Sequence, residues 1–107
     1  MNLLFVCSKN QWRSPTAEQV FKSYQGIHTR SAGTSASARH RINSRDIAWA
    51  DLILVMEERH KDTIKQQFPL ATQHRKMVVL DIADDYHYMD AQLVELLTLS
   101  VTPYLPA

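Results

Sequence analysis

Residues 3–15 read LLFVCSKNQWRSP, and this stretch decides the fold class. Its first four residues are continuously apolar, which is typical of a strand covered on both faces of a sheet. The polar residues from Ser8 to Arg13 then predict a loop. Ser14 suits the N-cap of a helix, and Pro15 suits its first helical position. The stretch therefore predicts a buried strand, a polar loop and a helix in immediate succession.

The alternation of strand and helix continues along the chain. Apolar spacing extends the first helix to about Gln25, and Gly26 suits its C-cap. Further strands are expected at Ile27–Ala32, Asp51–Val55 and Met77–Leu80, with helices from Met56 to Phe68 and around Leu93–Leu97, and a loop with room for a helical turn at residues 34–45. Strands that alternate with helices pair in parallel through right-handed crossovers. The prediction is a three-layer α/β fold, in which a four-stranded parallel sheet has helices on both faces.

Length, charge and cysteine usage exclude several classes of protein. The 107 residues are expected to form one domain, residues 1–107. Twelve basic and eleven acidic residues give a net charge of +1, so neither nucleic acid nor a membrane surface is an expected partner. The single cysteine, Cys7, excludes an internal disulfide and a zinc site of several thiolates. The first apolar run is too short for a signal peptide or a membrane span, which favours a cytoplasmic protein.

The loop after the first strand carries the chemistry. A loop that leads into a helix N-terminus directs backbone N–H groups inward and makes an anion-binding cradle. The same positive field favours a thiolate at Cys7, and the Arg13 guanidinium can hold two phosphate oxygens at once. Ser14 can donate its hydroxyl to the sulfur when that becomes a leaving group. We therefore expect a phosphate-binding loop formed by Ser8, Lys9, Asn10, Gln11, Trp12, Arg13 and Ser14. A buried cysteine that only packs in the core is the alternative.

This loop resembles that of the low-molecular-weight protein tyrosine phosphatases, which have a cysteine, five residues, Arg-Ser-Pro and usually Thr-Ala-Glu. Residues 13–18 match that motif in full, and residues 50–57 resemble the family's third-strand segment. Asn10 falls at the family's loop asparagine, and Ser31 falls at the serine that supports it. The resemblance spans Asn2 to about Asp90. It implies a cysteine-dependent phosphomonoester hydrolase that forms a phosphocysteine intermediate and uses no metal or other cofactor.

The resemblance also implies a general acid. The family protonates its leaving group with an aspartate in a late Asp-Pro-Tyr segment. Asp84 matches this aspartate, Asp85 replaces the proline, and Tyr86 matches the tyrosine. Asp85 is the alternative acid, and a solvated acidic loop is the plainer interpretation of the whole segment. Tyr86, Tyr88 and Trp12 are candidates for the rim of the pocket, where they would stack on an aromatic ring, and burial in the core is the alternative.

The chain departs from the family at several positions. A segment is missing between Thr34 and Ala38, Lys9 replaces a glycine, Trp12 replaces a second cysteine, and Ala36 stands where a supporting histidine is usual. The expected substrate is a phosphotyrosine protein or a small aryl phosphate, and the sequence indicates no particular oligomeric state. Two alternatives stay open. One is a module that binds phosphate or a phosphoprotein without turnover, and the other is an arsenate reductase that uses an external thiol.

Overall fold

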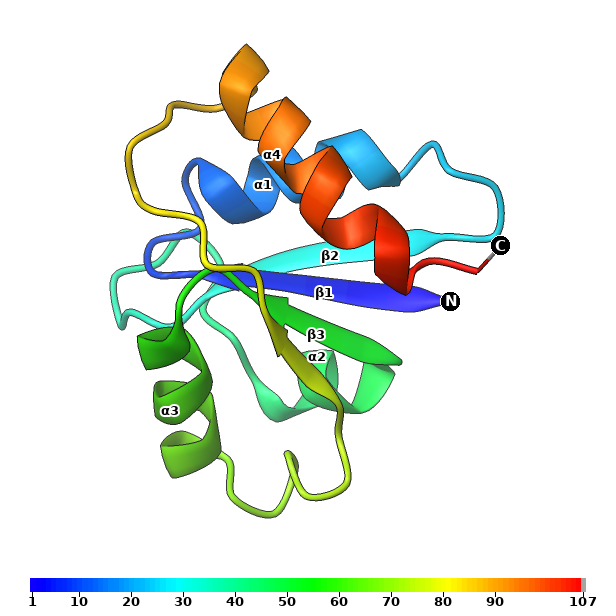
Figure 1. Ribbon diagram of the computed structural model, residues 1–107. Helices are drawn as coiled ribbons and strands as arrows, with labels where there is room; N and C mark the ends of the chain where they lie inside the picture. Colours follow the sequence, from blue (N-terminus) through cyan, green and yellow to red (C-terminus); the bar gives the residue numbers. More distant parts are fainter. Residues whose placement is uncertain (107) are drawn as a thin grey trace.

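A parallel sheet between two pairs of helices forms the architecture of the computed structural model, which describes residues 1–106 (Figure 1). The elements are β1 (Asn2–Cys7), α1 (Arg13–Phe21), β2 (His28–Gly33), α2 (Ser44–Trp49), β3 (Leu52–Val55), α3 (Glu58–Gln67), β4 (Met77–Val79), α4 (Ala91–Val101) and the short 3-10 helix η1 (Thr102–Tyr104). The strand order is β2-β1-β3-β4, and every neighbouring pair is parallel. The fold class expected from the sequence is confirmed.

Strand β1 lies between β2 and β3, and it is buried on both faces because helices cover each face of the sheet. Its odd-numbered residues Leu3, Phe5 and Cys7 belong to a core shared with α1 and α4. Its even-numbered residues Leu4 and Val6 belong to a second core shared with α2 and α3. Complete burial of a leucine or phenylalanine side chain contributes about 1.5–3 kcal/mol. The two cores together fix the carboxyl end of β1, where Cys7 lies.

Helix α1 begins earlier than predicted. Its N-cap is Trp12, which makes no side-chain capping hydrogen bond. Ser14 and Pro15 are therefore the second and third residues of the helix, not its N-cap and first residue. The Ser14 hydroxyl contacts the Cys7 thiol instead of a backbone N–H at the helix end. A hydroxyl used in this way cannot cap the helix, which explains the wrong prediction.

Helix α1 also ends at Phe21, before the predicted end near Gln25. The C-cap is Lys22, and the residues after it form a turn that leads into β2. Gly26 lies in this turn with φ of 78°, a conformation that glycine adopts without steric cost. The glycine therefore serves the approach to β2 rather than the end of the helix.

Helix α2 lies just beyond and partly within the segment predicted as loop. Asn43 is its N-cap, and the Asn43 side chain accepts from the Asp46 N–H at 2.9 Å. The Asp46 carboxylate accepts in turn from the Asn43 N–H at 3.2 Å, which completes a capping box. Only Ile47 of this helix belongs to the buried apolar core. One apolar residue is too few for a helical period, so the pattern did not predict a helix here.

Helix α3 begins at Glu58, so Met56 lies outside the helix that it was predicted to open. The Met56 N–H donates to the Val6 carbonyl at 3.0 Å, which continues the direction of β3. Its side chain packs in the core beside α1 and α4, whereas Ile64 of α3 packs in the core on the opposite side of the sheet. The pairing of β1 with β3, continued by Met56, therefore decides which face of the sheet the Met56 side chain packs on.

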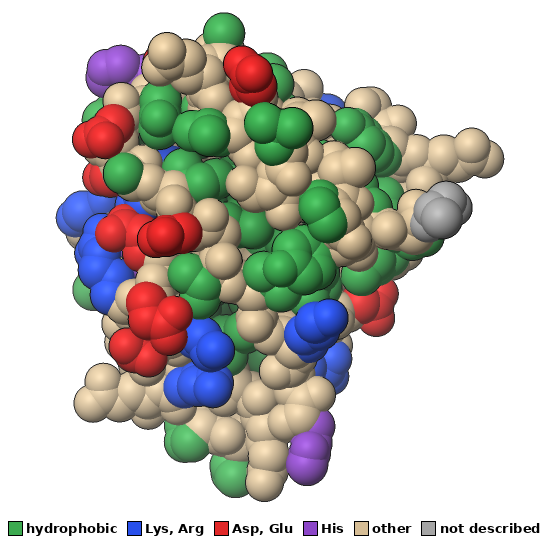
Figure 2. All heavy atoms as spheres, viewed as in Figure 1, with side chains coloured by type: hydrophobic (Ala, Val, Ile, Leu, Met, Phe, Trp, Pro, Cys, Tyr) green, Lys and Arg blue, Asp and Glu red, His purple; other side chains and the backbone are tan. Residues whose placement is uncertain are grey.

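The loops that follow the carboxyl ends of the strands gather at one edge of the sheet, on the left in Figure 1. In parallel α/β sheets, ligands bind at this edge. Figure 2 shows basic and acidic side chains concentrated on the same side of the molecule. Within residues 1–106, no helix is both long and apolar enough to cross a membrane.

Candidate active site

Cys7 lies at the base of a small pocket just beyond β1. Its side chain is buried, and its Sγ lies 3.0 Å from the Ser14 Oγ. The pocket has a volume of about 30 Å³ and is lined by Cys7, Ser8, Lys9, Gln11, Trp12, Arg13 and Asp84. This is room for about two water molecules. The pocket therefore suits a small anion such as a phosphoryl group and not an aromatic ring.

The backbone of the loop is held close to β2 and the segment after it. The Ser35 N–H donates to the Ser8 carbonyl and the Arg39 N–H donates to the Lys9 carbonyl, both at 3.0 Å. Asn10 has φ of 57°, a left-handed conformation that asparagine tolerates better than most residues. Such a conformation within a loop is typical of anion-binding concavities formed by successive N–H groups.

A chain of hydrogen bonds runs from Glu18 to the loop. The Glu18 carboxylate accepts from the Ser31 hydroxyl at 2.5 Å, so the Ser31 Oγ accepts from the Asn10 side-chain amide at 2.9 Å. The same amide donates to the Ser14 Oγ at 3.0 Å. The structure thus brings together Asn10 and Ser31, which the resemblance had associated, and places Ser14 in the same network. It adds Glu18, whose only signal in the sequence was its place at the end of the Thr-Ala-Glu motif.

The Ser14 hydroxyl accepts from the Asn10 amide and has two groups within reach of its own proton. These are the Cys7 Sγ at 3.0 Å and the Ala32 carbonyl at 3.3 Å. A thiolate is the stronger acceptor, because hydrogen bonds to charged groups are roughly twice as strong as neutral ones. An ionised sulfur can only accept, so the Ser14 hydroxyl can donate to it when Cys7 is a thiolate.

Arg13 is almost fully buried, at 2% exposure, and two of its guanidinium nitrogens face acceptors of the protein. Nη1 donates to the Glu57 Oε2 at 2.5 Å and to the Ile82 carbonyl at 2.8 Å, and Nε lies 3.6 Å from the Asp84 Oδ1. Within residues 1–106, Nη2 makes no hydrogen bond. Because Arg13 lines the pocket, its remaining N–H groups are available to an anion there.

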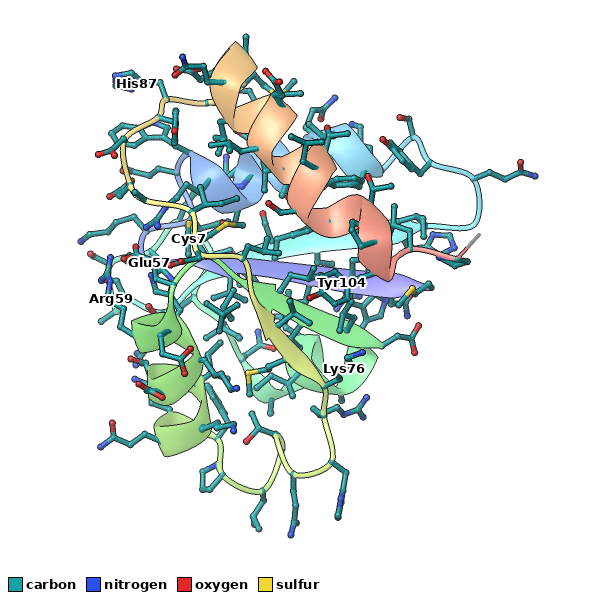
Figure 3. The ribbon with its side chains drawn as sticks, viewed as in Figure 1. Cys7, Glu57, Arg59, Lys76, His87 and Tyr104 are labelled. Atoms are coloured by element: carbon teal, nitrogen blue, oxygen red, sulfur yellow. The ribbon has the colours of Figure 1, made fainter. Side chains whose placement is uncertain are left out.

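Glu57 holds Arg13 in place. Hydrogen bonds from Arg59 and from Arg13 lower the pKa of Glu57 to about 2, so its carboxylate is ionised at neutral pH. Arg59 Nη2 lies 3.0 Å from the Glu57 Oε2, and the contact raises the pKa of Arg59. Figure 3 shows Glu57 and Arg59 beside Cys7 at the edge of the sheet. Sequence reasoning matched Glu57 to the end of the third-strand segment but gave it no role.

His60 is a second residue of the site that sequence reasoning left without a role. It belongs to α3, is 1% exposed, and its Nε2 lies 2.8 Å from the Ser8 Oγ. Its Nδ1 accepts from the Glu57 N–H at 3.1 Å. Burial lowers the pKa of His60 to about 4, with the positive charges of Arg13 and Arg59 adding to the effect. The imidazole is therefore neutral at pH 7.

In the acidic segment after β4, neighbouring residues differ in whether they line the pocket of Cys7. Asp84 lines the pocket, with its side chain 54% exposed, whereas Asp85 is exposed and does not line it. Tyr86 is not at the rim, contrary to the prediction. It is partly buried against the core and borders a separate depression beside α4. The aromatic neighbour of Trp12 is His87 instead, in an edge-to-face contact with centroids 4.8 Å apart.

The fold and the loop define a class: an α/β protein with a cysteine and arginine anion-binding loop at the end of its first strand. The family model described as low molecular weight phosphotyrosine protein phosphatase matches residues 2–49. A protein-arginine-phosphatase from Geobacillus stearothermophilus is 32% identical, and one from Bacillus subtilis (strain 168) is 34% identical. Each match covers 64% of this chain and 63% of the relative, so the chain spans less than two thirds of these relatives' length.

The structure of this chain is also similar to solved structures of phosphatases. The YwlE arginine phosphatase from Geobacillus stearothermophilus has a TM-score of 0.72 at 27% identity, over 92% of this chain and 87% of that one. Wzb from Vibrio vulnificus, in complex with benzylphosphonate, shares the fold with a TM-score of 0.78 at 23% identity, over 96% and 95% of the two chains. This chain is therefore similar to the low-molecular-weight protein tyrosine phosphatases in its first half, and it shares their fold.

Proposed function

We propose that this protein is a cysteine-dependent phosphatase that removes phosphoryl groups from phosphorylated protein side chains. The observation that carries the proposal is the pocket itself. It has the volume of a small anion, and the Cys7 sulfur lies at its base. Arg13 lines it with unused N–H donors, and the Ser14 hydroxyl lies 3.0 Å from the sulfur.

The proposed reaction has two steps. In the first, the Cys7 thiolate attacks phosphorus, an S–P bond forms, and the bond from phosphorus to the leaving group breaks. Arg13 and the loop N–H groups hold the non-bridging oxygens, and Asp84 gives its proton to the leaving group. In the second, Asp84 takes a proton from water as the water oxygen attacks phosphorus. The S–P bond then breaks, and Ser14 donates its hydrogen bond to the departing sulfur.

Asp84 supports the role of acid better than Asp85 does. Asp84 lines the pocket, and its Oδ1 lies 3.6 Å from the Nε of Arg13, the side chain that is proposed to hold the phosphoryl group. A carboxyl group must lie within hydrogen-bond reach of the atom that it protonates, directly or through one water. The exposed position of Asp85 outside the pocket lining does not meet that condition.

Two substrates are compatible with the pocket. Phosphotyrosine, the substrate expected from the sequence, carries an aromatic ring next to the phosphoryl group. Phosphoarginine, which the names of the relatives favour, carries a planar guanidinium there. A volume of about 30 Å³ leaves either planar group at the rim, where Trp12 is 37% exposed. Trp12 can stack on an aromatic ring or on a cationic plane.

A groove on the protein surface adjoins the pocket, and it can accept the main chain of a substrate beside the phosphorylated residue. This groove has a volume of about 290 Å³, and Gln11 lines both it and the pocket of Cys7. Lys22 and Arg39 contribute basic side chains to its walls, while Glu18 contributes an acidic one. A protein substrate can therefore extend from the pocket along α1 without leaving the surface.

Steady-state hydrolysis of an aryl phosphate tests the proposal. We expect turnover by the wild type that vanadate inhibits, and loss of nearly all of it in Cys7→Ser. Turnover by Cys7→Ser at the wild-type rate would contradict the proposal. Tight phosphate binding without turnover by the wild type would favour the binding module instead, and consumption of an external thiol that depends on arsenate would favour the arsenate reductase.

The substrate class is tested with matched peptides that differ only in the phosphorylated residue. We expect kcat/KM for a phosphotyrosine or a phosphoarginine peptide to exceed that for a phosphoserine peptide by about tenfold or more, because phosphoserine brings no planar group to Trp12. A Trp12→Ala variant should lose most of that preference. Equal rates on all three peptides would indicate an unselective phosphatase.

A further inference from the structure

We propose that His60 is a positioning residue for the anion-binding loop, which acts by turning the Ser8 hydroxyl proton into the pocket as a donor to a bound oxyanion. The inference deepens the proposed function, because the oxyanion in question is the phosphoryl group of the substrate. It gives a role to Ser8 and His60, whose side chains take no part in the two-step reaction described above. Its tests measure anion binding and the state of the imidazole, and neither requires turnover.

The first step concerns which nitrogen of His60 carries the proton. The Glu57 N–H can only donate, and it points at the His60 Nδ1 from 3.1 Å. Nδ1 must therefore present its lone pair, because a proton on Nδ1 would place two donors against each other. A neutral imidazole has one protonated nitrogen, so the proton of His60 lies on Nε2.

The second step concerns the charge of His60. A doubly protonated imidazole would also carry a proton on Nδ1, and it would lose the bond from Glu57. The ring is 1% exposed and lies near the positive charges of Arg13 and Arg59, which disfavour a further positive charge. Glu57 and Asp84 act in the opposite direction with smaller effect. The neutral form with the proton on Nε2 is therefore the form that fits its surroundings.

The third step concerns the direction of the Ser8 hydroxyl. His60 Nε2, as the proton carrier, donates to the Ser8 Oγ at 2.8 Å. The Ser8 hydroxyl is then an acceptor toward His60, and its own proton has to point elsewhere. No other hydrogen bond from this hydroxyl is formed within residues 1–106. Because Ser8 lines the pocket of Cys7, the proton faces the space where an anion would lie.

The arrangement gives the loop a donor beyond its backbone N–H groups and Arg13. With the opposite tautomer, the Ser8 hydroxyl would donate to His60 and present only lone pairs to the pocket. Lone pairs repel a phosphoryl oxygen, whereas a proton attracts it. His60 therefore decides whether Ser8 favours or opposes an oxyanion, although His60 is not among the residues that line the pocket.

Binding of inorganic phosphate tests the role of Ser8. Ser8→Ala removes the hydroxyl, and we expect the dissociation constant for phosphate to rise about tenfold, as for loss of one hydrogen bond to a charged group. Ser8→Thr keeps a hydroxyl at the same position and should restore most of the affinity. Unchanged phosphate affinity in Ser8→Ala would overturn the proposal.

A double-mutant cycle tests whether His60 acts through Ser8. His60→Leu should weaken phosphate binding about as much as Ser8→Ala does, and should add little in the Ser8→Ala background. Equal losses in both backgrounds would show that His60 acts on the fold and not through the hydroxyl. His60→Gln, which keeps an N–H donor of similar reach, should bind phosphate more tightly than His60→Leu. If His60→Leu does not fold, His60→Met, which also lacks an N–H donor, takes its place in the cycle.

The tautomer itself has a spectroscopic signature. A spectrum that correlates the imidazole protons with the two ring nitrogens of His60 distinguishes the neutral forms from each other and from the cation. We expect the form protonated on Nε2 at pH 7, and a proton on Nδ1 would overturn the proposal. Phosphate binding by the wild type without hydrolysis would end the phosphatase proposal and leave this inference standing. Failure of the wild type to bind phosphate would overturn both.

Discussion

Arg13 is the side chain on which most contacts of the site converge. A cation that is 2% exposed requires compensating partners, and Glu57 and the Ile82 carbonyl supply them at 2.5 and 2.8 Å. These partners occupy Nη1, and Nη2 makes no hydrogen bond within residues 1–106, so it is free to bind an anion in the pocket. The guanidinium thus serves two sets of contacts at once, which a single ammonium group cannot reproduce.

Replacement of Arg13 by lysine tests this double role. Arg13→Lys keeps the charge but loses the planar fork, so we expect kcat/KM for an aryl phosphate to fall about 10²-fold or more. The measurement is steady-state kinetics, with thermal unfolding of the same variant as a control for the fold. Kinetic constants equal to those of the wild type would show that Arg13 does not hold the phosphoryl group.

The assignment of the acid is tested by leaving-group dependence. Asp84→Asn should lower kcat by about 10²–10⁴-fold for a poor leaving group, and much less for p-nitrophenyl phosphate, whose leaving group needs little protonation. Asp85→Asn is the matched control, because Asp85 is outside the pocket lining and should respond weakly to either substrate. The reverse pattern would assign the acid to Asp85.

The two residues with lowered pKa values predict how stability depends on pH. The pKa of His60 is lowered from 6.5 to about 4 in the folded protein. As pH decreases, His60 therefore binds a proton at a higher pH in the unfolded chain than in the folded protein. The free energy of unfolding consequently falls between about pH 6.5 and pH 4. This loss is at most about 3 kcal/mol. The pKa of Glu57 is lowered from 4.5 to about 2, so its contribution is lost at lower pH, between about 4.5 and 2.

Urea unfolding at a series of pH values separates the two contributions. His60→Gln should flatten the dependence between pH 6.5 and 4 and leave the dependence below pH 4 in place. Glu57→Gln should do the opposite. An unchanged slope between pH 6.5 and 4 in His60→Gln would show that this histidine is not held neutral by the fold.

At the scale of elements, the first strand, its loop and the first helix were predictable, because each has a local signal. An apolar run ends at Cys7, polar residues follow, and the Arg-Ser-Pro motif leads into the helix. Helix α2 had no comparable signal, since its capping box and one buried isoleucine hold it in place. Short-range patterns therefore found the elements that have a continuous apolar surface and missed the one that does not.

The same distinction applies to the site. Cys7, Arg13 and Ser14 lie within one loop and its helix, so their proximity followed from the sequence. Glu57 and His60 reach the loop from 44 and 52 residues away in the sequence, through the parallel pairing of β1 with β3. No local pattern marks such contacts. The wrong placement of Tyr86 has a similar origin, because its position depends on how the acidic loop packs beneath α4.

The end of β2 is a point where an element and the loop must approach closely. A Cβ at Gly33 would lie 2.5 Å from the Ser8 carbonyl oxygen and 2.5 Å from the Ala38 Cβ. Gly33→Ala must therefore displace the loop, and we expect a loss of about 1–3 kcal/mol in stability, with weaker phosphate binding. Urea unfolding and phosphate titration measure the two effects.

Gly26→Ala is the control for this prediction. A Cβ at Gly26 meets nothing within 4 Å, and only its φ of 78° opposes the substitution. Gly26 lies before β2, at the opposite end of that strand from the loop. We expect Gly26→Ala to lose stability but to keep the phosphate affinity of the wild type. Unchanged phosphate affinity in a folded Gly33→Ala would show that the loop does not depend on this close approach.

At the scale of the whole molecule, the sheet brings together groups that are far apart in the chain. β1 delivers Cys7, β2 ends against the loop, the turn after β3 supplies Glu57, and the segment after β4 supplies Asp84. All four strands therefore contribute to one edge, although the chain has only 107 residues. The two cores on either side of the sheet hold the strands, and therefore the residues at this edge, in fixed positions.

Detection of a phosphocysteine tests the account most directly. Wild-type protein is mixed with an aryl phosphate, quenched in acid within the first turnover, and digested for mass spectrometry of the peptide that contains Cys7. We predict a phosphoryl group on Cys7 in the wild type, more of it in a variant with slower second-step chemistry such as Asp84→Asn when the leaving group is good, and none in Cys7→Ala. Hydrolysis by the wild type with no phosphoryl group on Cys7 under any of these conditions would contradict the account.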